Sequence, residues 1–360
     1  MDGNREIFIK LLMSLCYLRV DTLMATDNID IKIANCLELH HQEGDVPLDT
    51  IRRFLDFAHG QDIYGEMAYH VLRNGTWSVG MPILEDSILG DIRDESEQAG
   101  VLFVADHWLG SGSPDNAYIT SPVEPERETM ARYFAARAEG MHIISDNEHG
   151  STAVVGSPKK RNLDRFKPPI LFSKGLEYFG DTIARAINHA PDAGVIYAPE
   201  RLVCIDLPNG ETDIVYNMGQ AVDVARNAQN VLDTRLHGRV KVMVDLKAAY
   251  WSDPRETVER AFNLIPKDLR SYHFHVQSPN MGPPGYNDRG EFMGEGVYDM
   301  SRDIGFIVGL ARQGHPVVVS VEAFQPFFGN IGVRSVEERQ AYLKKGNDYL
   351  KELIAKARQN

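Results

Sequence analysis

The sequence predicts an α/β fold in which parallel strands alternate with helices. Four short, strongly apolar stretches carry this prediction, and each ends on or beside a side chain that can bind a metal ion. They lie at residues 195–200, 240–245, 271–276 and 316–322, and each interval leaves room for a helix and a return to the next strand. The 360-residue length is that of a single (β/α)₈ TIM barrel spanning residues 1–360.

The side chains that end these stretches are expected to converge. Parallel strands separated by helices place all their carboxyl ends on one face, which brings together Glu200, Asp245, His275 and Glu322. Three carboxylates and one imidazole suit Mn²⁺, Mg²⁺ or Co²⁺ better than structural zinc, and leave positions for substrate oxygens. Any one of these acids is more simply explained as a strand cap or a partner of an arginine. Four of them in successive units favour a metal site.

Such a site predicts a metal-dependent enzyme that moves a proton next to a carbonyl. A divalent ion that chelates a carbonyl and a hydroxyl stabilises the enediolate formed on loss of the neighbouring proton. A ligand carboxylate with a free oxygen can act as the base. Glu200 and Glu322 would face the substrate from different strands, so that one removes the proton and the other returns it. We therefore predict an isomerase or epimerase, and the family resemblance described below implies that its substrate is a sugar.

Two histidines in one stretch compete for the role of metal ligand. His273 and His275 are two residues apart and therefore lie on the same face of the strand. His275 is nearer the mouth of the barrel and is the predicted ligand. His273 would lie one layer deeper, where a hydrogen-bonded core histidine is the better interpretation.

Further candidates for catalysis are less specific. Lys247 could bind a substrate oxygen or donate a proton, or it could form a salt bridge to a site carboxylate. His107 follows a predicted strand and could reach the site, whereas His149 lies in a long predicted loop and could act from a lid. For each of these histidines a surface position is the simpler interpretation. Glu66 and His70, near the end of an early strand, are weaker candidates.

The second half of the chain resembles the xylose isomerase-like TIM-barrel family, which includes sugar and sugar-phosphate isomerases and epimerases such as the tagatose/psicose epimerases. The resemblance covers about residues 174–330. It implies an eight-stranded barrel, a Mn²⁺-type ion held by Glu200, Asp245, His275 and Glu322, and the two glutamates as the acid–base pair. The motifs that carry it are APE at 198–200, VMVD at 242–245, YHFH at 272–275, GEGVYD at 294–299 and VEAF at 321–324.

Two departures from the ketose epimerases leave an alternative open. Ala248 stands where those enzymes carry a histidine, and Met281 stands where they carry an arginine; both family residues contact the substrate. The alternative is a metal-dependent lyase, such as a dehydratase or the metal subunit of a C-glycoside deglycosidase, which cleaves 3-oxo-glycosides with a small partner subunit. A third possibility is a non-catalytic barrel whose acidic face binds a partner.

The composition indicates which kinds of partner and which cellular compartment to expect. The chain has 38 basic and 51 acidic residues, a net charge of −13, which argues against nucleic acid and is compatible with a small carbohydrate or glycoside substrate. Three scattered cysteines indicate a reducing compartment. The apolar run at 7–18 is interrupted by Lys10 and is interpreted as a core element rather than a signal peptide. No stretch has membrane-spanning length. We expect a cytoplasmic protein and, by the family resemblance, a homo-oligomer.

The first half of the chain gives weaker signals, in order. Residues 7–18 could form a first strand, 31–40, 63–70 and 101–105 further strands, and 47–57 and 84–98 helices, with Gly100 at a helix C-terminus. Residues 124–139 are expected to form a helix that Gly140 ends. Residues 141–169 show no firm regular pattern, so 108–173 is predicted as a long insertion or lid after an early-middle strand. In the second half the expected helices are 175–189, 220–236, 254–264, 301–312 and a terminal helix at 336–357.

Overall fold

The structure is a computed structural model of the chain. The residues it describes are 29–37, 48–67, 86–106, 109, 113–114, 117–145, 151–156, 163, 166, 170–200, 214–215, 217–250, 256–277, 298–321 and 336–359.

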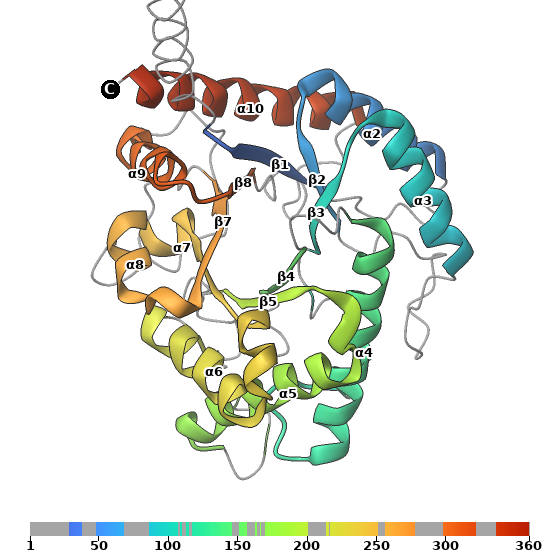
Figure 1. The fold of residues 1–360 in the computed structure, drawn as a ribbon, viewed down its shortest axis with the longest axis vertical. Helices are drawn as coiled ribbons and strands as arrows, with labels where there is room; N and C mark the ends of the chain where they lie inside the picture. The colour runs from blue at the N-terminus through green and yellow to red at the C-terminus, as the bar shows by residue number, and fades with distance from the viewer. Residues whose placement is uncertain are drawn as a thin grey trace, which may run out of the picture.

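Eight parallel strands form a barrel, as the sequence predicts. In the sheet they follow the order β5-β4-β3-β2-β1-β8-β7-β6, and the ring is completed by parallel bridges between residues 197 and 240 and between residues 200 and 243. Figure 1 looks down the barrel, with the strands inside and the helices around them. The strands are β1 Ile31–Leu37, β2 Tyr64–Met67, β3 Phe103–Asp106, β4 Thr152–Val155, β5 Ile196–Pro199, β6 Val242–Asp245, β7 Arg270–Val276 and β8 Val317–Val321.

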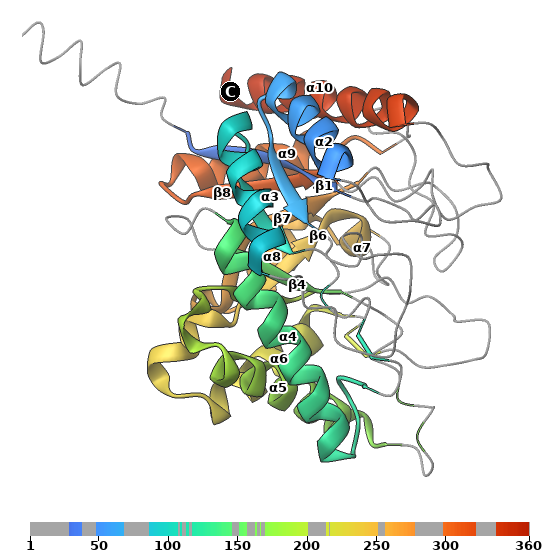
Figure 2. The same ribbon diagram turned by 90° about the vertical axis from the view of Figure 1, so that its right-hand side faces the viewer.

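The helices form the outer ring. α10 packs beside α9 and α2 on one side of the barrel (Figures 1 and 2). Short 3₁₀ turns at Pro191–Ala193, Thr234–Arg239 and Lys267–Leu269 lead into β5, β6 and β7. The α-helices are α2 Leu48–Gln61, α3 Asp86–Ala99, α4 Glu124–Ile144, α5 Phe172–His189, α6 Met218–Val231, α7 Leu246–Tyr250, α8 Val258–Leu264, α9 Ser301–Arg312 and α10 Val336–Gln359.

Side chains along each strand point alternately outward to the helices and inward to the barrel axis, which gives two separate apolar regions. Phe103, Tyr197 and Phe274 are fully buried in the main core between the sheet and the helices. Val154, Ala198 and Met243 form a separate small cluster, as expected for side chains that point into the barrel from β4, β5 and β6. This part of the interior is therefore filled by apolar groups.

The predicted insertion at 108–173 is wrong in its extent. Helix α4 and strand β4 both lie within these limits as regular parts of the barrel. Strand β4 has only four residues, which is too short for an alternating pattern to show in the sequence. Gly140 does not end α4; it is buried within the helix, which continues to Ile144. Residues 7–18 lie outside the described part of the chain.

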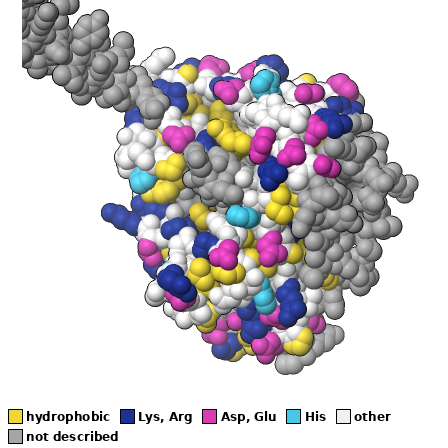
Figure 3. All heavy atoms as spheres, turned by 45° about the vertical axis from the view of Figure 1, so that its right-hand side comes forward, with side chains coloured by type: hydrophobic (Ala, Val, Ile, Leu, Met, Phe, Trp, Pro, Cys, Tyr) yellow, Lys and Arg dark blue, Asp and Glu magenta, His cyan; other side chains and the backbone are white. Residues whose placement is uncertain are grey.

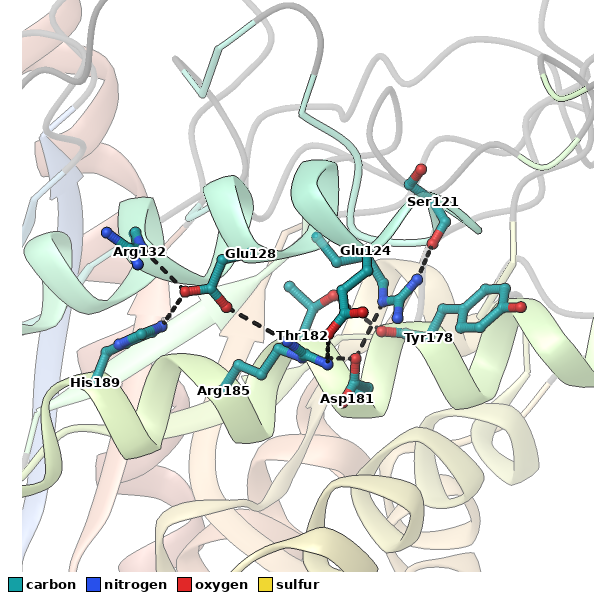
Figure 4. A network of polar contacts seen from close by, with 10 residues as sticks. Ser121, Glu124, Glu128, Arg132, Tyr178, Asp181, Thr182, Arg185 and His189 are labelled. Carbon is teal, nitrogen blue, oxygen red and sulfur yellow. Dashed lines mark hydrogen bonds and ion pairs between the residues drawn. The ribbon is translucent and has the colours of Figure 1, made fainter.

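Helix α5 is held against α4 by a chain of charged contacts (Figure 4). Arg185 reaches Glu124 at 2.9 Å and Asp181 at 2.9 Å, and Glu128 accepts from Arg132 at 2.9 Å and contacts His189 at 2.8 Å. These side chains are partly exposed, so each pair stabilises the packing only modestly. The Arg185–Glu124 and His189–Glu128 contacts join the two helices, whereas Arg185–Asp181 and Arg132–Glu128 lie within one helix and orient these side chains.

The surface shows no single-sign field on the face in view. Acidic and basic side chains are interspersed there (Figure 3). Among the helices that the structure describes, none combines the length and the apolar character needed to cross a membrane.

Candidate metal centre

Three adjacent strand ends bring Glu200, Asp245 and His275 together. Asp245 and His275 are register partners in the β6–β7 pair, and Glu200, directly after β5, is bridged to Met243 of β6. One ligand atom from each of the three lies within 4.8 Å of the others, and all three side chains are buried. The structure thus brings together three of the four residues whose convergence the sequence predicts. Glu322, the fourth, lies outside the described residues.

Asp245 is held in a strongly unfavourable electrostatic environment. Burial raises its pKa to about 6, and the negative charge of Glu200 acts in the same direction. Lys247 and a 2.6 Å hydrogen bond from the backbone N–H of Ala248 act in the opposite direction without cancelling the effect. Two buried carboxylates that repel each other are an arrangement that a cation would stabilise.

His275 lies between two carboxylates, one at each ring nitrogen. Its Nδ1 is 3.0 Å from Oε1 of Glu200, and its Nε2 is 3.4 Å from Oε2 of Glu66. Glu66 comes from β2, on the far side of β1 and β8 in the sheet order. The ring therefore faces the site with Nδ1 and the barrel interior with Nε2.

Glu66 is the centre of a second buried cluster. Its Oε1 is 2.5 Å from Nε2 of His273 and accepts a hydrogen bond from the Ser320 hydroxyl, while that hydroxyl lies 2.8 Å from His273 Nε2. Burial opposes ionisation of Glu66, but His275 and His273 overcome it and hold its pKa well below the ordinary value. His273 is thus the hydrogen-bonded interior histidine that the sequence predicts.

Of the three other predicted catalytic residues, the structure describes only Lys247. Lys247 is buried in α7 directly after β6, and its charge acts on Asp245. It therefore lies beside the site. His107 and His149 lie outside the described residues.

The structure adds two residues to the candidate site. The sequence supports Glu66 only weakly, because the four-residue strand that carries it shows no clear period. Gln277 is the second. It is fully buried, two residues beyond His275 and hence on the same side of the chain, and among the described residues its side-chain amide has no hydrogen-bond partner. The same spacing that selected His273 and His275 could have found it.

Solved structures share this architecture. A D-psicose 3-epimerase from Clostridium cellulolyticum H10, solved with D-tagatose, superposes with a TM-score of 0.63 at 13% identity, covering 90% of this chain and 99% of that one. The fold is that of the xylose isomerase-like TIM barrels. The IolI protein with a bound zinc atom gives 0.61 at 14% identity, covering 91% and 99%. The 3-keto-D-glucoside 4-epimerase YcjR from E. coli gives 0.57 at 13%, covering 90% and 99%. No protein-family model matches the sequence, and no curated protein matches it.

Proposed function

We propose that this protein is a divalent-metal-dependent sugar isomerase or epimerase that works by proton transfer next to a carbonyl. The observation that carries the proposal is the buried group of Glu200, Asp245 and His275, whose ligand atoms lie within 4.8 Å of one another at the carboxyl ends of three adjacent strands. Support comes from the shared fold, since the similar structures include sugar epimerases and a zinc-bound protein.

The donor set fits a divalent ion. Two carboxylates and an imidazole offer mostly oxygen donors, and Glu322, next in the chain after β8, is proposed to add a third carboxylate. This set suits Mn²⁺, Mg²⁺ or Co²⁺, and we propose Mn²⁺ among them on the family resemblance. The raised pKa of Asp245 is a feature of the protein itself that a bound cation would relieve. When bound, the ion supplies electrostatic stabilisation of negative charge on the substrate oxygens.

The chain's own residues would move the protons. Glu200 is 3% exposed, so water does not compete for its carboxylate, and we assign it as one acid–base group. Glu322 is proposed to serve as the other from the opposite face of the substrate. Lys247, buried next to Asp245, is placed to bind a substrate oxygen. His107 and His149 remain proposed auxiliary acid–base groups.

Gln277 is proposed as a contact for sugar hydroxyls. Its amide supplies two N–H donors and one carbonyl acceptor, and it is buried two residues after His275. A buried amide that pairs with a hydroxyl only when substrate is bound favours substrates that carry that hydroxyl. Gln277→Leu should therefore raise KM for the preferred sugar more than for its deoxy analogue.

Metal content is the first test. Purified protein should contain about one divalent ion per chain by elemental mass spectrometry, as one such site implies, and Glu200→Gln should lose most of it. Glu128→Gln, at the α4–α5 contact on the outside of the barrel, is the matched control and should retain the ion. Wild-type protein that binds no metal after incubation with Mn²⁺ would refute the proposal.

The reaction is tested by isotope exchange. D-Fructose, D-psicose, D-tagatose, L-ribulose and a 3-keto-glucoside are incubated with metal-loaded protein in D₂O. Turnover with deuterium at the carbon next to the carbonyl supports proton transfer. Turnover of any of these sugars without exchange would count against the mechanism. Release of an aglycone from a 3-oxo-glycoside would instead identify the lyase alternative.

A further inference from the structure

The two buried clusters share His275, and they differ in how well their charges are already balanced. In the first, the buried carboxylates of Glu200 and Asp245 converge with His275, with one ligand atom of each within 4.8 Å of the others. In the second, Oε1 of Glu66 already has His273 and the Ser320 hydroxyl as partners. Glu66, His273 and His275 also bring three possible ligand atoms within 4.8 Å of one another, but they offer one carboxylate where the first cluster offers two. The first cluster is therefore the better cation site, which leaves the second with a different task.

We propose that Glu66 is a positioning residue that holds His275 in the orientation and tautomer required of a metal ligand. The inference rests on the proposed metal-dependent function. Glu66 acts through His275 and touches neither the ion nor the substrate. Its Oε2 faces His275 Nε2 at 3.4 Å, on the edge of the ring opposite to the Nδ1 that faces Glu200 at 3.0 Å.

The chemistry of a neutral imidazole makes this arrangement directional. One ring nitrogen carries the proton and the other carries the lone pair that can bind a cation. A carboxylate at Nε2 stabilises the tautomer with the proton on Nε2. Glu200 lies nearer to Nδ1, at 3.0 Å, and competes for the proton until a cation pairs with its carboxylate. With a cation bound there, Glu66 is the carboxylate left to hold the proton on Nε2 and to leave the Nδ1 lone pair directed at the first cluster. Such a carboxylate also increases the basicity of the ring and restricts its rotation.

Glu66 is itself held in place, as a positioning residue must be. It is fully buried, and Ser320 of β8 and His273 of β7 bond to its other oxygen. The carboxylate thus connects β2 to the two strands that lie beyond β1 in the sheet. The interior of such barrels is commonly filled by Val, Ile and Leu, so an ionised carboxylate here is costly unless its partners compensate for it.

The first experiment measures cobalt binding by wild type, Glu66→Gln and Ser320→Ala, using a competing chelator. Glutamine keeps the size of the side chain and removes the carboxylate charge. We expect Glu66→Gln to weaken Co²⁺ binding about 10- to 100-fold and to alter the visible Co²⁺ spectrum. Ser320→Ala removes a hydrogen bond to the other oxygen of Glu66 and should leave the dissociation constant near the wild-type value.

The control separates positioning from a purely structural role. If Glu66 only ties β2 to β8, the two variants should weaken cobalt binding equally, which would overturn the proposal. Equal binding by wild type and Glu66→Gln would also overturn it while leaving the metal-dependent function intact. Wild-type protein that binds no cobalt would instead refute the proposed function, and the inference with it.

A second measurement needs no variant and therefore does not depend on one folding. In Co²⁺-loaded wild type, the ligand imidazole should show a shifted N–H proton that disappears in D₂O. If Nε2 carries this proton, it lies next to two ring C–H protons and gives Overhauser effects to both. A proton with only one such neighbour would place the ion on Nε2, and the role assigned to Glu66 would be wrong.

Discussion

Asp245 makes the metal-free protein less stable as the pH rises, and this can be measured. The perturbation is Asp245→Asn, which keeps the shape of the side chain and an oxygen acceptor for the Ala248 N–H, a hydrogen bond of 2.6 Å, but cannot ionise. The wild-type carboxyl is buried, and burial together with the charge of Glu200 raises its pKa to about 6. In the unfolded chain the same group ionises near its ordinary value of 3.8.

The size and the sign follow from the difference between the two pKa values. A shift of about 2 units corresponds to about 3 kcal/mol at 1.4 kcal/mol per unit. Below pH 4 the group is protonated in both states and contributes nothing. Between about pH 4 and pH 6 the unfolded state loses the proton first, so the free energy of unfolding falls. Above about pH 6 both states are ionised and the loss stays constant.

Urea unfolding of the metal-free proteins at half-unit steps from pH 4 to 7.5 measures this. The wild type minus Asp245→Asn difference cancels the titrating groups that do not interact with Asp245, and Glu200 is the neighbour whose own titration the substitution also changes. It should become less favourable to wild type by up to about 3 kcal/mol across that window and then level off. A difference that does not change with pH, or that grows in favour of wild type, would refute the electrostatic reasoning. Saturating Mn²⁺ should restore wild-type stability most strongly above pH 6, because the ion and the proton compete for the same carboxylate.

Other predictions concern the packing of the barrel. Gly180→Ala places a Cβ 2.6 Å from a side-chain atom of α6 and 2.8 Å from its backbone, so it should cost about 1–3 kcal/mol by thermal unfolding, whereas Gly309→Ala on α9 has open space and should be neutral or stabilising. Asn347→Ala breaks the reciprocal buried amide pair with Asn35, whose hydrogen bonds are 2.8 and 3.0 Å long. It should lower the free energy of unfolding in urea by about 1–3 kcal/mol. The double variant Asn35→Ala/Asn347→Ala should lose less than the sum of the losses of the two single variants. Arg185→Gln should cost about 1 kcal/mol in low salt and less in high salt.

The fold and the convergence of Glu200, Asp245 and His275 could be predicted because the signals were local and repeated. β6, β7 and β8 each carry a strong apolar run, and a two-residue spacing selected His275 over His273 for the mouth of the barrel. Strand β4, by contrast, has four residues with no alternation long enough to detect. The role of Glu66 could not be predicted, because it depends on contacts with His275 and Ser320, 209 and 254 positions away.

The charges at the barrel mouth explain why the two clusters belong together. Among the described residues, ionised Glu66, Glu200 and Asp245 carry −3 and Lys247 carries +1, so with neutral histidines the sum is −2. A divalent cation offsets most of the negative charge that these residues and the proposed ligand Glu322 carry. Without the ion, burial and the charge of Glu200 raise the pKa of Asp245 to about 6, so at lower pH a proton takes the place of the cation there. Metal binding at such pH should therefore release a proton from Asp245. Glu66, whose pKa is held low beside the histidines, keeps its charge in either state, which is what a fixed partner for His275 requires.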